Sequence, residues 1–177
     1  MPRTAPVPSL PPLSARPTDT TFRTLIRTMG VLKRVMEPYF VTFGISGSQW
    51  AVLRALQRAE EDGRSGLRVT DIGDRLLIRP PSVTGVLDRL QKAGLVTREP
   101  LPGDQRARQV SLTLRGRARV ERVLEHFSAQ VETVLGALTP TERKELQRLL
   151  DKLGTHLETL ADEQANGNGS QTKTDAP

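Results

Sequence analysis

The sequence predicts a mainly α-helical fold with one small β-hairpin, and three features of the chain support this prediction. Apolar residues recur at helical spacing through most of residues 20–163. Capping boxes and prolines at first-turn positions mark where separate helices begin. Between about residues 95 and 114 the pattern changes to alternation of apolar and polar residues, which is typical of strands. We therefore expect one folded region built from helices and a single hairpin, with a further very short strand over Leu67–Val69.

The composition narrows the classes of function. Lys and Arg together number 26 against 20 Asp and Glu, and the net charge of +6 favours an anionic partner such as nucleic acid. A basic protein that is merely soluble would have the same balance. The chain has no cysteine, which excludes disulfides, thiol chemistry and Cys-based metal sites. Its 2 histidines are too few for a ligand cluster, so we expect no metal and no cofactor.

No stretch of the sequence has the composition of a membrane span or an export signal. There is no run of about 18 apolar residues, and the first residues lack an apolar segment. We therefore expect a cytoplasmic protein with no membrane partner.

Both ends of the chain are predicted to be disordered. Residues 1–19 contain six prolines, which remove backbone donors and favour an extended chain over a packed element. Residues 164–177 have almost no apolar side chains to bury. The folded part is therefore expected over about residues 20–163, and the 36% hydrophobic content of the chain is enough for its core.

The N-terminal half of the folded part begins with two predicted helices. Apolar residues at helical spacing run from Phe22 to Tyr39. The second helix starts at Ser46, which forms a capping-box pattern with Gln49, and it ends near Ala59.

The next two helices have the spacing of a helix-turn-helix motif. A short helix over about 70–76 and a second helix over about 80–93 are separated by a three-residue turn. The second helix is expected to bury one apolar stripe, made of Val83, Val86, Leu87 and Leu90. In such motifs the second helix enters the DNA major groove with its first residues towards the base edges. A helix of about 13 residues is about 20 Å long, which suits a groove about 12 Å wide.

A β-hairpin is predicted directly after this helix. Its strands are Leu95–Glu99 and Gln109–Leu114, the second with Val110, Leu112 and Leu114 facing inward. The loop between them is expected to hold a turn, an acid and two arginines: Pro100, Pro102, Gly103, Asp104, Arg106 and Arg108. Cations at the tip of such a wing reach the minor groove, where the negative potential is enhanced.

Two longer helices are predicted at the C-terminal end. One runs from Leu114 to Leu138, and its arginines are expected to form a solvated face. The other begins at Pro140, behind a capping box of Thr139 and Glu142. It carries leucines spaced 4, 3, 4 and 3 residues apart: Leu146, Leu150, Leu153, Leu157 and Leu160. This seam fits either a contact within one chain or a coiled-coil-like contact between chains.

Enzymatic function is not expected. The sequence has no glycine-rich phosphate loop and no set of nucleophile, base and orienting acid with supporting context. Glu37 and Asp88 are the carboxylates nearest to apolar stripes, and we expect both to serve as cap or ion-pair residues.

The chain resembles the MarR-type winged-helix transcriptional regulators. The resemblance lies in ISGSQWAVLRAL, in SVTGVLDRLQKAGLVTREPLPGDQRARQVSLTLRG and in the order of the elements around them, and it covers about residues 20–163. The most specific part is the wing pattern of Asp104, one residue and Arg106, followed by Leu112, Thr113 and Gly116.

This resemblance implies a homodimer that binds a near-palindromic operator in double-stranded DNA. Residues 20–45 and 115–163 would be dimerisation helices that interleave between the two chains, and residues 46–114 would be the DNA-binding region. The resemblance also implies repression that is released by a small, often aromatic or phenolic, effector. A winged-helix module for protein contact, or a DNA-binding dimer without an effector, is the alternative.

The expected DNA contacts come from the second helix of the motif and from the wing. The resemblance implies that Arg106 enters the minor groove and that Asp104 braces its loop. Arg79 stands where many members have a Ser or Thr cap, and Gly85 stands where many have a longer polar residue, so Gly85 has no side chain to hydrogen-bond a base. The predicted DNA-binding residues are Arg79, Pro81, Ser82, Thr84, Arg89, Asp104, Arg106 and Arg108.

A ligand site is expected around two of the few aromatic residues. Tyr39 and Trp50 are predicted to converge, with Arg27 or Arg54 near enough to attract a carboxylate. The alternative is that both aromatic side chains are ordinary core residues.

Overall fold

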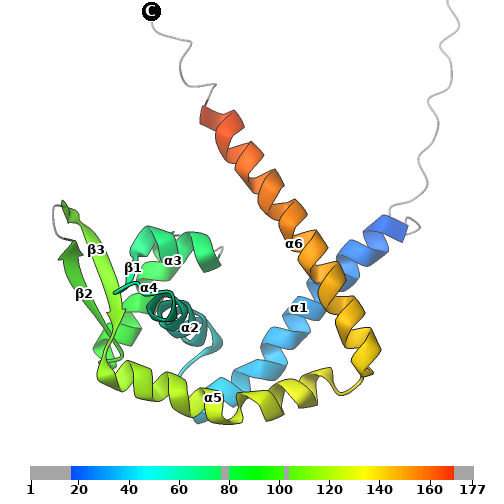
Figure 1. The fold of residues 1–177 in the computed structure, drawn as a ribbon, viewed down its shortest axis with the longest axis horizontal. Helices are drawn as coiled ribbons and strands as arrows, with labels where there is room; N and C mark the ends of the chain where they lie inside the picture. The colour runs from blue at the N-terminus through cyan, green and yellow to red at the C-terminus, as the bar shows by residue number, and fades with distance from the viewer. Residues whose placement is uncertain (1–16, 77–79, 102–103, 170–177) are drawn as a thin grey trace, which may run out of the picture. The chain divides into compact units, whose positions relative to one another are not determined.

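The computed structural model describes residues 17–76, 80–101 and 104–169, and its elements follow the predicted order (Figure 1). They confirm a mainly α-helical protein with one small sheet. The chain forms two compact units, residues 1–130 and 131–177. The elements are α1 (Pro17–Thr42), α2 (Gly47–Glu61), β1 (Leu67–Arg68), α3 (Val69–Leu76), α4 (Pro80–Lys92), β2 (Val96–Leu101), β3 (Asp104–Leu112), α5 (Leu114–Leu135) and α6 (Pro140–Gly169).

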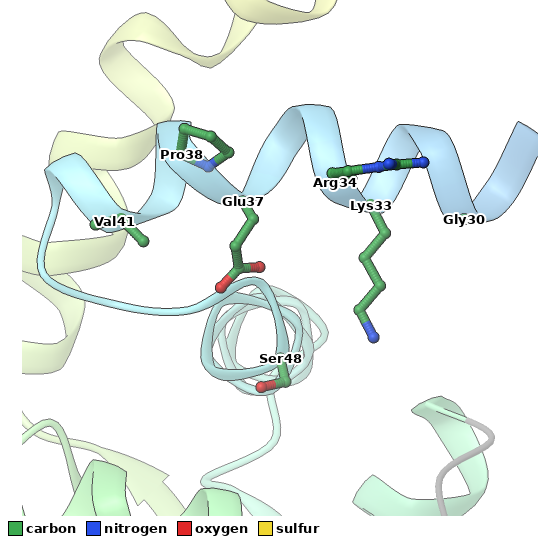
Figure 2. A pocket seen from close by; sticks show the side chains of 7 residues that line it. All are labelled: Gly30, Lys33, Arg34, Glu37, Pro38, Val41 and Ser48. Atoms are coloured by element: carbon green, nitrogen blue, oxygen red, sulfur yellow. The ribbon is translucent and has the colours of Figure 1, made fainter.

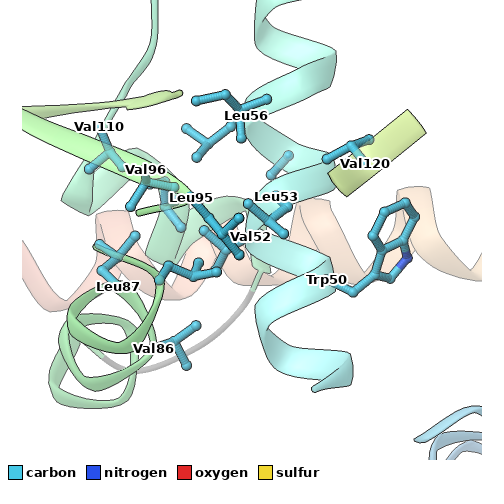
Figure 3. Packing of buried hydrophobic residues seen from close by; sticks show 14 of the residues in the cluster. Trp50, Val52, Leu53, Leu56, Val86, Leu87, Leu95, Val96, Val110 and Val120 are labelled. Atoms are coloured by element: carbon cyan, nitrogen blue, oxygen red, sulfur yellow. The ribbon is translucent and has the colours of Figure 1, made fainter. Parts of the chain in front are cut away.

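The core of the first unit lies where α2, α4 and the sheet meet (Figure 3). Leu53 and Leu56 of α2 and Leu87 and Leu90 of α4 have 0% exposed surface. Val83 and Val86 are buried with them, which confirms the apolar stripe predicted for α4. Since full burial of a leucine side chain contributes about 1.5–3 kcal/mol, this stripe fixes which face of α4 is left to the solvent.

The sheet has the order β1-β3-β2, and both pairings are antiparallel. The strands of the hairpin extend closer to its tip than the sequence predicted, to Leu101 on one side and from Asp104 on the other. The predicted loop over residues 100–108 was therefore too long. The proline cluster predicted a loop. A proline on an edge strand is nevertheless compatible with strand pairing, because its missing N–H donor can face away from the neighbouring strand.

Leu114 was wrongly predicted as an inward-facing strand residue. It is the first residue of α5 and is 83% exposed, because β3 ends at Leu112 and the alternation ends with it. Thr113 instead caps the new helix, since its Oγ1 accepts a hydrogen bond from the Gly116 N–H at 2.9 Å. A Cβ on Gly116 would overlap the carbonyl oxygen of Leu95, so α5 can begin this close to the sheet only with glycine there.

The local signals at the other helix ends are confirmed. Ser46 and Gln49 form the predicted capping box, and Gly94 has a φ of 68° just beyond α4. The carboxylate of Glu37 accepts a hydrogen bond from the Gly47 N–H at 3.0 Å, so Glu37 caps α2 as predicted. This bond also joins the end of α1 to the start of α2.

The ordered part of the chain is longer than predicted at both ends. α1 begins at Pro17, a residue suited to a first helical turn, so residues 17–19 are helical and not part of a disordered arm. α6 continues to Gly169, because the polar stretch after Ala161 begins with good helix formers that need no burial to extend a helix. The predicted disorder of residues 1–16 and 170–177 lies outside the described residues.

The second unit contains the end of α5 and all of α6. Thr139 and Glu142 form the predicted capping box, since each backbone N–H donates to the other's side chain. These hydrogen bonds lower the pKa of Glu142 below its usual value. Arg143 pairs with Glu132 at 2.6 Å, which ties α6 to the end of α5.

Within the part of the chain that the structure describes, no helix combines the length and apolar character needed to cross a bilayer.

Candidate nucleic-acid interface

The exposed face of α4 carries polar side chains from its first turn to its last turn. Ser82, Thr84 and Arg89 are all exposed, while the opposite face of the helix is fixed in the core. Gly85 lies among them and is half-buried. α4 follows α3 after the short connection expected of a helix-turn-helix, and the β2–β3 hairpin extends beside both helices (Figure 1). The arrangement presents one polar helix face next to a β-ribbon.

Arg98 joins the ribbon to this helix. Its Nη2 donates to the Asp88 carboxylate at 2.7 Å and to the Thr84 carbonyl at 3.4 Å, so one β2 side chain contacts two successive turns of α4. Asp88 is thereby confirmed as an ion-pair residue. A partly exposed pair of this kind contributes only about 0–1 kcal/mol to stability. The two contacts link α4 to β2 of the wing.

The wing has an irregular tip. Pro100 pairs with Arg108 and Leu101 pairs with Asp104, so the register shifts between Pro100 and Leu101, and β3 carries extra residues at this point. Such bulges bend a ribbon and redirect its side chains. The backbone of Arg106 lies in this irregular segment of β3, and Arg108 is exposed beside it. Both arginines therefore lie on a strand, whereas the sequence placed them in or just after a loop.

Several predicted DNA-binding side chains fall outside the described residues. Arg79 is outside them entirely. The backbones of Pro81, Asp104 and Arg106 lie in α4 and β3, but their side chains are not among those that the structure describes.

Two arginines at the start of α5 make contacts within the first unit. Arg117 pairs with Glu60 of α2 at 2.8 Å, and this contact raises its pKa above the usual arginine value. Arg119 donates to the carbonyl of Phe43, the residue after α1. These two residues link helices and do not form a free basic face. Arg115 and Arg122 are exposed, as expected for a solvated helix surface.

The structure brings Tyr39 and Trp50 into one aromatic cluster. Both rings contact Phe40 and Phe127, and Trp50 is only 7% exposed. The Tyr39 hydroxyl donates to the Val123 carbonyl at 2.6 Å, and burial raises its pKa. Tyr39 therefore links α1 to α5.

The two arginines predicted for the ligand site lie apart from each other. Arg27 is on α1, about 18 Å along the helix from Tyr39, in a hollow with Phe22 and Ile26. Arg54 lines a cleft between α2 and α3 together with Trp50, Arg58 and Arg75. This cleft has a volume of about 420 Å³ and carries three arginines. Arg54 also pairs with Glu61 at 3.3 Å, which leaves further donors of its guanidinium group unused by that contact.

A larger hollow lies between α1 and the start of α2 and was not predicted. It has a volume of about 760 Å³, and Figure 2 shows Lys33 and Glu37 reaching from α1 towards α2. Arg34 and Val41 also line it. The helical spacing of Lys33, Arg34, Glu37 and Val41 could have indicated a common face. The aromatic residues of the sequence indicated a different part of the molecule.

Comparisons with known proteins agree with this geometry. Residues 43–107 match the sequence profile of the MarR family. The HTH-type transcriptional regulator FarR of Neisseria gonorrhoeae is 31% identical over 138 residues, which cover 78% of this chain and 88% of FarR. The HTH-type transcriptional regulator PecS of Dickeya dadantii is 28% identical over 134 residues, which cover 76% of this chain and 80% of PecS. The structure is similar to that of a mutant MarR from E. coli complexed with operator DNA, with a TM-score of 0.69 and 25% identity over 76% of this chain and 93% of that one.

Proposed function

Because the chain belongs to the MarR family of transcriptional regulators, we propose that it is a homodimeric repressor that binds a near-palindromic site in double-stranded DNA. The observation that carries this proposal is the exposed polar face of α4, which Arg98 holds in a fixed orientation beside the wing. A helix fixed in this way matches the major groove, and a β-ribbon beside it reaches the adjacent minor groove. We place such a protein in the cytoplasm, together with the DNA that it binds.

The DNA contact that we propose for each side chain depends on the element that carries it. Ser82, Thr84 and Arg89 read base edges or neighbouring phosphates from α4, and Arg79 and Pro81 lie at or before its first turn. Arg106 enters the minor groove from the bulged tip, with Asp104 bracing it, and Arg108 contacts phosphate from the strand beside it.

The proposed dimer is supported by two apolar surfaces that a single chain leaves uncovered. On α1, Phe22 is 66% exposed and Met29 is 60% exposed. On α6, the leucines of the predicted seam are 37–52% exposed: Leu146, Leu150, Leu153, Leu157 and Leu160. Soluble proteins rarely leave such rows of large apolar side chains in water. A second copy of the chain would cover them, and residues 20–45 and 115–163 would then form the dimerisation region around residues 46–114.

Binding to DNA is tested by its dependence on salt. We expect the logarithm of the affinity for a duplex to fall linearly with the logarithm of the salt concentration, with a slope of about 0.9 for each phosphate neutralised. Fluorescence anisotropy of a labelled duplex, measured at salt concentrations between about 50 and 200 mM, gives this slope. A module used only for protein contact would bind no duplex, and a flat salt profile would argue against phosphate contacts.

The proposed effector is an aromatic carboxylate that binds the cleft between α2 and α3. Trp50 supplies an apolar edge, and Arg54 lies on the same wall with two further arginines. A planar guanidinium pairs well with a carboxylate, and the cleft volume of about 420 Å³ suits a small ligand. Such a ligand weakens DNA binding only by favouring a conformation that misfits the two half-sites, so its preference between conformations limits its effect.

Replacing Arg54 tests this effector site with less risk to the core than replacing Trp50. We expect Arg54→Gln to raise the concentration of aromatic acid needed for release from DNA by about tenfold, as one lost charged contact predicts. Titration of the acid into a preformed protein–DNA complex measures this shift. Arg27→Gln is the matched control, because Arg27 lines a different hollow. An unchanged response of Arg54→Gln, or no release by any aromatic acid, would exclude this site.

A further inference from the structure

We propose that Gly85 sets the distance between α4 and DNA, so that the missing side chain at this position determines both the affinity and the sequence preference of the protein. This inference rests on the proposed function, since it concerns the same helix face. It assigns a specific role to a residue that makes no side-chain contact of its own.

The fold does not require glycine at position 85. A Cβ built there would meet only Nη1 of Arg89, at 3.9 Å, which is an ordinary van der Waals contact with the end of a flexible side chain. The situation differs at Gly47 and Gly116, where a Cβ would meet the Glu37 carboxylate at 2.8 Å or overlap a backbone carbonyl. Those two glycines are explained by packing inside the chain, and Gly85 is not.

Glycine also weakens the helix at this position. Gly85 lies in the middle of α4, away from both caps, and its backbone φ is not in the positive range that favours glycine. In a helix interior glycine is the least favourable residue after proline, whereas alanine is the most favourable. We therefore expect the free protein to be more stable with alanine there, and we infer that close approach of a partner is the reason for the absent side chain.

The residues near Gly85 indicate how closely a partner would approach the helix. Ser82 and Arg89 lie three residues before it and four residues after it, which places all three on one face of the helix. Ser82 and Thr84 are exposed but short, so they reach base edges only when the helix backbone lies deep in the groove. A side chain at position 85 would stand between the backbone and the base pairs. Glycine there lets the first turns of α4 come close enough for the short side chains to make contact.

The charge around Gly85 fits DNA as the approaching partner. Arg89 lies on the same face, and Asp88, the nearest acid, is neutralised by Arg98 at 2.7 Å. Among the described side chains of α4, the one carboxylate beside Gly85 is therefore paired and does not repel a phosphate backbone. The arrangement allows close approach of an anionic surface.

The test compares Gly85→Ala and Gly85→Leu with the parent protein on one duplex, selected by the parent from a randomised double-stranded library. We expect Gly85→Ala to raise the melting temperature of the free protein by about 2–4 °C. The same variant is expected to bind the selected duplex about tenfold more weakly, which is the effect of about one lost base contact. Gly85→Leu is expected to bind more weakly still, and Gln91→Ala, an exposed substitution elsewhere on α4, is expected to bind as the parent does.

Repeating the selection with Gly85→Ala separates a role in recognition from a general loss of affinity. We expect the altered protein to enrich a different base pair at the centre of each half-site, because the added methyl group changes which base edges fit. Unchanged affinity and unchanged preference, or a lower melting temperature of the free variant, would overturn the inference while leaving DNA binding intact. If the parent protein enriches no duplex, the proposed function fails first, and the inference fails with it.

Discussion

Arg106→Ala is expected to weaken binding to the operator by about 1–3 kcal/mol, without loss of the fold. This corresponds to roughly a 5- to 150-fold rise in the dissociation constant. The reason is the irregular tip of the wing, where the register shift after Pro100 places Arg106 between the paired residues Asp104 and Arg108. A cation in a narrow minor groove gains from an enhanced potential, so its loss costs more than the loss of a peripheral phosphate contact.

Two controls make the Arg106 measurement specific. Arg122→Ala removes the same charge from an exposed position on α5 and is expected to change the affinity little. Circular dichroism of each variant checks that the fold is intact. If Arg106→Ala bound labelled operator as tightly as the parent, the wing would have no part in recognition.

Deletion of residues 139–177 is expected to abolish both dimer formation and binding to the full operator. The deletion removes α6 and its leucine seam, which is one of the two apolar surfaces that we propose a second copy of the chain covers. Two half-sites one helical turn apart need two linked recognition helices, so a monomer would bind only half of the operator. Analytical ultracentrifugation and a binding titration measure both effects.

A point substitution separates loss of the dimer from loss of folding. Leu153→Glu keeps α6 but places a charge in the seam, and we expect it to weaken the dimer, while Lys152→Glu at the neighbouring exposed position is expected not to. A truncated chain that sedimented as a stable monomer and still bound the full operator with parental affinity would refute the proposed dimer.

The parts of the fold that follow from short-range signals were predictable from the sequence. The stripe of α4 has a helical period, and Val83, Val86, Leu87 and Leu90 are all buried. The capping boxes at the starts of α2 and α6 depend on residues three apart, and both are present.

Features that depend on tertiary contacts were harder to predict. The strands continue through a proline-rich stretch because pairing with β3 outweighs the local turn signal. Leu114 continues the alternation of β3 in the sequence, but β3 ends at Leu112 and α5 begins at Leu114 behind the Thr113 cap.

The candidate site could be predicted only in part, because some of its contacts also depend on tertiary packing. The residues of α4 could be assigned to an exposed face because the helical period fixes both faces at once. No periodicity indicates that Arg98 on β2 contacts Asp88 and Thr84, since the contact spans 10 and 14 residues and crosses from strand to helix. The separation of about 18 Å between Arg27 and Tyr39 along α1 follows from helical rise and could be read from the sequence. That Arg54 and Trp50 share a cleft with Arg58 and Arg75 depends on the packing of α2 against α3, which the sequence does not show.

Selection of duplexes from a randomised library by the full-length protein, followed by sedimentation of the complex, tests the central claim most directly. We predict that the enriched sequences contain two inverted half-sites whose centres lie about one helical turn, roughly 34–36 Å, apart. We also predict two protein chains on each duplex. The absence of any enriched sequence, or a single half-site occupied by one chain, would contradict the assignment of this protein as a dimeric, sequence-specific DNA-binding regulator.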